Sequence, residues 1–138
     1  MRTYSPKKVS VSFNGSILSG FMKGTFIEAD QNEDSFTPDI GSDGEVARVA
    51  SADESGTVKL TLQQMSASND VLSAALRQDR LTNLGTGVLF IKDASGRTLL
   101  NLAEAWIRKP ASVTFADGST GREWTFDTGK IDMQEGGN

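Results

Sequence analysis

In Thr57-Val58-Lys59-Leu60-Thr61-Leu62-Gln63-Gln64-Met65, apolar and polar side chains alternate more cleanly than anywhere else in the chain. Side chains of a strand point alternately to its two faces, so Val58, Leu60 and Leu62 share one face. This period of two predicts a strand with one face in a core and the other in water.

A single helix is predicted after this strand. Ser68-Asn69-Asp70 offers side chains that can cap a helix N-terminus. Apolar residues then follow at helical spacing: Val71, Leu72, Ala75 and Leu76. Arg77 and Arg80 would lie near the negative end of the helix dipole. We expect a helix over about residues 70–79.

Short strands and turns explain most of the remaining pattern. Residues 8–18 predict a hairpin because Asn14-Gly15 follows alternating apolar residues, and residues 24–28 predict a strand beside it. Further strands are expected at 88–91, 98–107, 122–126 and 131–133. The predicted core consists of Val9, Val11, Phe13, Val58, Leu60, Leu62, Leu72, Leu76, Leu89, Ile91, Trp124 and Phe126. The sequence therefore predicts a mainly β fold with one helix.

The segment 28–54 differs from the rest in composition. Its nine acidic residues are opposed only by Arg48: Glu28, Asp30, Glu33, Asp34, Asp39, Asp43, Glu45, Asp53 and Glu54. Because it has little to bury on its own, we expect an extended acidic loop that is mobile unless something covers it. Its apolar residues are Phe36, Ile40, Val46 and Val49. They are either anchors for a partner surface or, over residues 45–50, a short strand bordering the loop.

Length and composition limit the function. The 138 residues are enough for one domain, 1–138. A formal net charge of −4 disfavours a surface that grips nucleic acid. The chain has no cysteine and no histidine, which removes thiol catalysis, most transition-metal sites and the commonest general base. We therefore expect no catalytic residues, no metal and no cofactor.

Two weaker patterns do not change this expectation. Residues 30–34 resemble the start of a calcium loop, but Ser35 and Gly41 stand where glycine and a bidentate glutamate are needed. Paired carboxylates could act as in glycosidases, yet no apolar setting marks one as a catalytic acid. No apolar stretch is long enough to span a bilayer, and the first residues lack the apolar block of a signal peptide. No membrane partner is expected.

Four stretches carry a resemblance to a known family. They are Tyr4-Ser5-Pro6-Lys7-Lys8-Val9-Ser10-Val11-Ser12-Phe13, residues 55–72, Ala105-Trp106-Ile107-Arg108-Lys109-Pro110, and residues 122–126 with the ending Gly136-Gly137-Asn138. In these stretches the chain resembles the tail tube proteins of contractile-tailed bacteriophages, a family of short phage structural proteins. The resemblance covers most of the chain.

The resemblance implies a β-sandwich or half-barrel with one flanking helix. It further implies homo-hexameric rings that stack into a tube, with tail sheath, baseplate and tail terminator proteins as partners. DNA would pass through the lumen without specific binding. The location would be the tail of the virion, after assembly in the host bacterial cytoplasm.

Within such a tube, three groups of residues are candidates for contacts. Phe36, Ile40, Val46 and Val49 are expected at subunit interfaces. Arg2, Lys7 and Lys8 belong to a basic amino end that can pair with acids of an adjacent ring. Glu28, Asp30, Glu33 and Asp34 are candidates for the lumen.

Two other classes of function stay open. A small β-sandwich module that binds a carbohydrate or a protein ligand would have the same strand pattern. A small hydrolase using carboxylates is a weaker alternative, for which the sequence indicates no particular acid.

Overall fold

The structure is a computed structural model that describes residues 3–137. In this part of the chain the strands are β1 (Val9–Phe13), β2 (Ser16–Leu18), β3 (Ile27–Gln31), β4 (Phe36–Ile40), β5 (Val46–Ala50), β6 (Gly56–Gln63), β7 (Gly87–Asp93), β8 (Leu99–Lys109), β9 (Gly121–Thr128) and β10 (Asp132–Gln134). The α-helix is α1 (Ser68–Thr82), and a 3-10 turn covers Pro6–Lys8.

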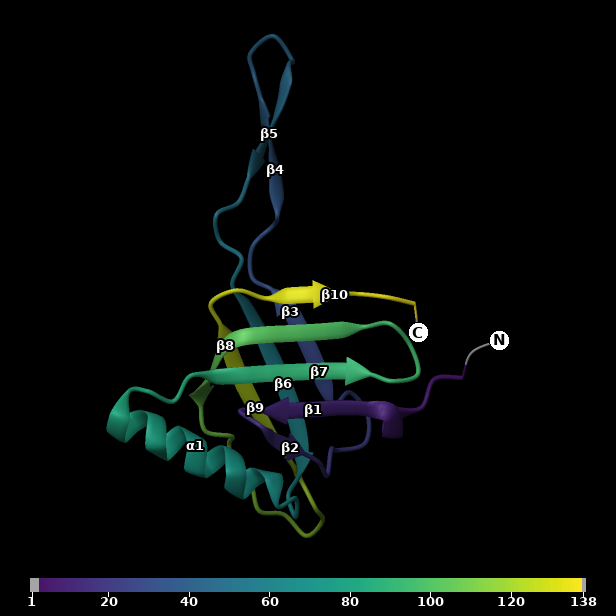
Figure 1. Cartoon of the computed structure of the whole chain (residues 1–138), viewed down its shortest axis with the longest axis vertical. Coiled ribbons are helices and arrows are strands. Elements are labelled where there is room, and N and C mark those ends of the chain that lie inside the picture. Colours follow the sequence, from purple (N-terminus) through teal and green to yellow (C-terminus); the bar gives the residue numbers. More distant parts are fainter. Residues whose placement is uncertain (1–2, 138) are drawn as a thin grey trace.

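An antiparallel sheet in the order β2-β1-β7-β8-β9-β6-β3 folds over the long strand β8 into two layers. One side of β8 pairs with β7, and the other side pairs with β10 near its start and with β9 near its end. The strands β1, β2, β7 and β10 thus form one layer and β3, β6 and β9 the other, as Figure 1 shows. The fold is the expected mainly β sandwich or half-barrel.

The core lies between these layers. All residues of the predicted core are buried except Val9, which is partly exposed. Phe13 and Phe126 join the layers through an edge-to-face contact, with ring centroids 5.1 Å apart. Several further core residues come from β2, β8 and the turn before β10: Leu18, Leu100, Leu102, Ala105, Ile107 and Ile131. The apolar face of β6 is therefore at the centre of the molecule, as its alternation predicts.

The helix α1 lies against one end of the sandwich, where Leu72 and Leu76 are buried (Figure 1). The prediction that Ser68-Asn69-Asp70 caps it was wrong, because the N-cap residue is Ala67, which makes no side-chain cap hydrogen bond. Instead, the Ser68 hydroxyl accepts a hydrogen bond from the Ser19 N–H at 2.9 Å. Asn69 accepts one from the Trp124 indole N–H at 3.0 Å. These side chains attach the helix to the sandwich.

The strand expected at 24–28 begins later and lies elsewhere. β3 starts at Ile27 and pairs with β6, Ile27 lying opposite Leu60, so it forms the sheet edge farthest from β1 and β2. Positive φ angles at Gly20 and Gly24 allow the chain to cross from one layer to the other between β2 and β3.

The acidic segment is more regular than we expected. Instead of an irregular loop, β4 and β5 form a separate two-stranded hairpin, which confirms the alternative of a strand near residues 45–50. Asp43-Gly44, with Gly44 at φ +86°, supplies the turn. We call residues 36–50 the arm. Figure 1 shows it projecting from the sandwich along the longest axis of the molecule.

Candidate assembly interface

The arm carries an apolar face that no described residue covers. Directly paired residues of an antiparallel ladder point to the same side, and the pairs are Phe36 with Ala50, Pro38 with Arg48, and Ile40 with Val46. Of these side chains, Ile40 and Val46 are 65% and 63% exposed, and Phe36 is 51% exposed. Three of the four predicted anchors thus share one face.

Val49 is on the opposite face of the arm, because it pairs with Thr37. Arg48 belongs to the apolar face, where its guanidinium carbon lies 4.2 Å from the centroid of the Phe36 ring. A lone two-stranded hairpin is marginally stable in water. An exposed apolar face on such a hairpin is typical of a surface that binds another protein.

Hydrogen bonds hold the base of the arm to the sandwich. The Asn32 N–H donates to the Ser55 carbonyl at 3.0 Å, and the Ser51 N–H donates to the Ser35 carbonyl at 2.8 Å. The Ser55 hydroxyl and N–H both donate to the Asp53 carboxylate, which lowers the pKa of Asp53. The arm is therefore anchored at its base by polar contacts, while its apolar residues stay outside the core.

A second candidate surface is the outer face of β3, β6, β9 and the end of β8. Glu28 lies opposite Lys59, and Asp30 lies opposite Thr57. On the same face, the guanidinium of Arg108 binds the carboxylate of Asp127, with Nε 2.9 Å from Oδ2. This hydrogen bond, together with the negative charge, raises the pKa of Arg108. The face thus carries charges of both signs.

The four lumen candidates do not share one surface. Glu28 and Asp30 lie on the exposed face of the sheet, whereas Glu33 and Asp34 follow β3 in the turn at the base of the arm. Of the basic candidates, Lys7 and Lys8 are exposed in the 3-10 turn. Arg2 lies outside the described residues.

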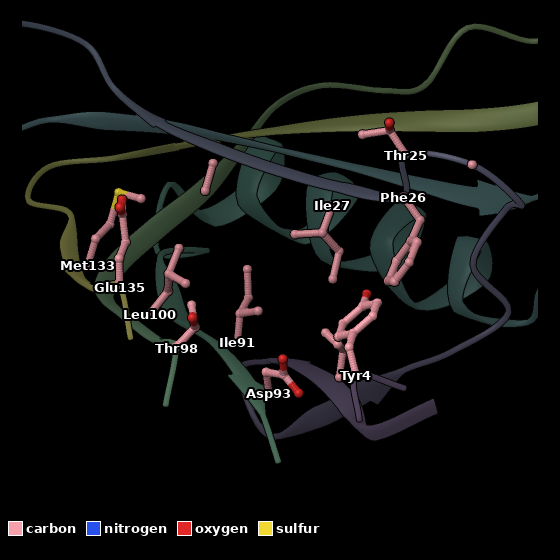
Figure 2. A pocket seen from close by; sticks show the side chains of 13 residues that line it. Tyr4, Thr25, Phe26, Ile27, Ile91, Asp93, Thr98, Leu100, Met133 and Glu135 are labelled. Atoms are coloured by element: carbon pink, nitrogen blue, oxygen red, sulfur yellow. The ribbon is translucent and has the colours of Figure 1, made fainter. Parts of the chain in front are cut away.

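An apolar groove that the sequence analysis did not predict lies near the beginning of β1. Its volume is about 380 Å³. Figure 2 shows Phe26 and Ile27 on one side facing Ile91 and Leu100 on the other. Tyr4, Val9, Asp93, Met133 and Glu135 also line it. Val9 and Ile91 belong to the predicted core, and the pairing of β1 with β7 places them beside Asp93 in one layer. Phe26 and Ile27 become their neighbours only because the other layer packs over them.

A hollow of about 520 Å³ continues this groove along the start of β1. Val9, Gly24 and Phe26 line both spaces, and Lys7 and Lys23 line only the hollow. The apolar groove is thus flanked on one side by two cations. The described residues therefore form two surfaces that could bind another chain: the apolar face of the arm, and the groove with its basic extension.

The described residues include neither a cluster suited to a metal ion nor a helix suited to a membrane. No group of three or more acidic, histidine or cysteine side chains there is placed to hold a metal ion. No helix of residues 3–137 has the length and apolar character needed to cross a membrane.

Comparisons of the sequence point to phage tails. The family described as bacteriophage PhiTE tail tube protein matches residues 1–136. The chain is similar to structural protein ORF10 of Pseudomonas phage KPP10, with 31% identity, covering 99% of this chain and 83% of that protein.

Comparisons of the fold point to contractile injection systems. A chain from the sheath/tube terminator of an extracellular contractile injection system, PVC, matches with a TM-score of 0.69 and 13% identity, covering 98% of this chain and 99% of the other. A chain from the PVC sheath-tube complex matches with a TM-score of 0.65 and 13% identity, covering 96% and 91%. The cap of the anti-feeding prophage matches with a TM-score of 0.61 and 10% identity, covering 97% and 92%. At these identities the similarity establishes the fold.

Proposed function

This chain belongs to the bacteriophage PhiTE tail tube protein family, and on that premise we propose that six copies close into a ring and that rings stack into a hollow tube. As a member of this family it is a structural protein of the phage tail and hence of the virion. We further propose that residues 1–138 form a single domain, and that this domain functions by assembling with other copies and not by catalysis.

Exposed strand edges support ring formation. The sheet ends at β2 on one side and at β3 on the other, and neither strand has a further neighbour among the described residues. Unpaired strand edges are prone to pair with another chain, and a closed ring of identical subunits satisfies them without open ends. In the proposed ring, β3 of one copy lies beside the sheet of the next.

The observation that carries the proposal is the exposed arm. Ordering each arm residue costs about 1 to 2 kcal/mol of backbone entropy. Each of the few apolar side chains returns about 1.5 to 3 kcal/mol, and only when it is buried. Phe36, Ile40 and Val46 therefore stabilise the arm fully only against a neighbouring subunit or ring. We assign the arm to contacts between subunits, with Val49 on its other face.

The outer face of the layer containing β3, β6 and β9 is the proposed lumen wall, with Glu28 and Asp30 on it. Its charged residues are Glu28, Asp30, Lys59, Arg108, Lys109, Glu123 and Asp127. Mixed signs with a small excess of acid suit a conduit for DNA, because a wall that attracted phosphates would retain the genome by counterion release. Glu33 and Asp34 lie outside this wall, and we propose that acids of the segment 28–54 outside it pair with Lys7, Lys8 or Arg2 of an adjacent ring.

Filter binding with duplex DNA tests the conduit. We expect assembled tubes to retain no DNA at any ionic strength. Tight retention that falls with salt would contradict the conduit and favour a nucleic-acid-binding protein. The same salt series should loosen ring stacking if the charges of the amino end and of the segment 28–54 pair across rings.

Partners and location follow the same reasoning. The solved structures with this fold come from sheath-tube, terminator and cap assemblies. We propose that this tube binds sheath and terminator proteins of its own tail, and a baseplate at its other end. Assembly would take place in the cytoplasm of the host bacterium.

Negative-stain imaging of the purified protein over a concentration series tests the assembly directly. We expect rings and stacked tubes as the concentration rises. A variant in which a short turn replaces residues 36–50 should keep the fold and lose the stacks. A protein that stays monomeric at all concentrations would contradict the proposal and favour a small binding module.

A further inference from the structure

We propose that the apolar groove receives the arm of a second copy of this chain, with Arg48 of that arm bound to Asp93. This inference rests on the proposed function, and it specifies which surface of the neighbour the arm contacts. Two independent features support it. The groove contains a buried carboxylate oxygen without a hydrogen-bond partner among the described residues, and the only charged side chain on the apolar face of the arm is an arginine.

Asp93 is the acidic feature of the groove. It is 4% exposed, and its Oδ1 accepts hydrogen bonds from the Ser95 N–H at 2.9 Å and the Ser95 hydroxyl at 2.6 Å. Its Oδ2 is buried and has no hydrogen-bond partner among residues 3–137. A buried carboxylate oxygen without a partner is costly, so a donor arriving with the neighbour would be strongly favoured. Glu135 lines the same groove and adds negative charge.

The apolar face of the arm offers a matching donor. The side chains on this face are Phe36, Pro38, Ile40, Val46, Arg48 and Ala50, and Arg48 is the only charged one. A guanidinium presents several N–H donors in one plane and suits a carboxylate better than a lysine does. With Arg48 on Asp93, the neighbouring Phe36 ring reaches the apolar walls formed by Ile27, Ile91 and Leu100.

The acidic tip of the arm agrees with the same orientation. Asp39, Asp43 and Glu45 surround the turn, and Glu45 is three residues from Arg48, about 10 Å along a strand. The groove continues into the hollow lined by Lys7 and Lys23. An arm lying along both spaces therefore places acid against lysine at one end and arginine against aspartate at the other.

The occupant must be a second copy. Figure 1 shows the arm leaving the sandwich and pointing away from it, so its apolar face does not reach the groove of its own chain. Two complementary surfaces at different places on one chain produce a head-to-tail contact, which repeats from copy to copy. A repeating contact of this kind is what stacking of rings requires.

Site-specific cross-linking in assembled tubes tests the contact, because the chain has no cysteine of its own. Tubes are formed from an equal mixture of Ala50→Cys and Tyr4→Cys and are treated with a short bismaleimide. Ala50 lies on the same arm face as Arg48 and its substitution leaves that arginine in place, and Tyr4 lies at the groove. We expect a dimer containing one copy of each variant. The matched control replaces Tyr4→Cys with Leu84→Cys, at an exposed site near the opposite end of the sandwich, and should give no such dimer.

A double-mutant cycle tests the ion pair itself. Arg48→Gln and Asp93→Asn should each raise the concentration needed for tube formation by roughly 10- to 100-fold, the range for hydrogen bonds to charged groups. The double variant should assemble no worse than either single variant, because the first change already removes the pair. Arg48→Gln combined with Asp117→Asn, an exposed acid away from the groove, should show additive effects.

The outcomes separate this inference from the proposed function. If the protein forms no tubes, both are wrong. If tubes form, but position 50 is cross-linked only to the Leu84 position, or Arg48→Gln and Asp93→Asn are additive, the tube stands and the groove is not the receptor. Thermal unfolding identifies a variant that fails to fold, and the cross-link, which leaves Asp93 unchanged, then decides the question.

Discussion

The strands β6 and β4 have similar side-chain patterns and opposite surroundings. In β6, Val58, Leu60 and Leu62 share one face, and each is fully buried between the layers. In β4, Phe36, Pro38 and Ile40 share one face, and Phe36 and Ile40 remain at least half exposed. Alternation is therefore enough to produce a strand in both places, but it does not determine what covers the strand.

The difference separates two sources of stability. The apolar face of β6 is buried in the core between the two layers of the same chain, so its burial contributes to folding. The apolar face of the arm has no such cover, so its burial can contribute only to assembly. Substitutions in β6 should therefore lower the free energy of unfolding, whereas substitutions in the arm should mainly raise the protein concentration needed for tube formation.

Leu60→Ala should cause the largest loss. Removing a buried leucine side chain typically lowers the free energy of unfolding by about 2 to 5 kcal/mol, and Leu60 is fully buried. Thermal unfolding should show a lower melting temperature, and tube yield should fall with it. Lys59→Ala, on the exposed face of the same strand, is the control and should change stability little. An unchanged melting temperature for Leu60→Ala would contradict the register of β6.

Asn69→Ala should cause an intermediate loss. Asn69 accepts the hydrogen bond of the Trp124 indole and also donates to the Gln63 carbonyl at 2.9 Å. Leaving the buried indole N–H without a partner costs about 1 to 3 kcal/mol. Denaturant unfolding measures the change, with Asn101→Ala at an exposed position of β8 as the control. Equal stability of the two variants would show that Asn69 does not attach α1 to the sandwich.

Ile40→Ser should leave folding nearly unchanged and impair assembly. Ile40 is 65% exposed, and surface substitutions of this kind usually change stability by less than about 0.5 kcal/mol. Tube formation, measured by sedimentation and imaging, should require a higher protein concentration. Thr37→Ser, on the other face of the arm, is the matched control. A destabilised subunit with normal tubes would reverse the roles assigned to the two regions.

Local patterns predicted most of the sandwich. The alternation of β6, the Asn14-Gly15 turn and the apolar spacing of α1 all depend on near neighbours in the chain, and the corresponding elements are present. β3 was assigned to the wrong edge, because strand order depends on contacts that local pattern does not contain. The role of Ser68 and Asn69 was missed for the same reason, since their partners Ser19 and Trp124 are distant in sequence.

The candidate interface was predictable only in part. The nine acids of 28–54 suggested a loop. The β-branched residues Thr37 and Ile40 before Asp43-Gly44, and Val46 and Val49 after it, nevertheless form a hairpin despite the charge. The apolar anchors were identified from composition, but their division between two faces follows from the register. The groove could not be predicted, since the residues on its opposite walls come from strands in different layers.

Hydrogen exchange of the free subunit and of the assembled tube tests the central claim most directly. The amides of β6 serve as the internal reference and should be protected in both states, because their cover belongs to the same chain. We expect the amides of residues 36–50 to exchange rapidly in the free subunit and to be strongly protected in the tube. Strong protection of the arm already in the free subunit, or rapid exchange of the arm in intact tubes, would contradict the account.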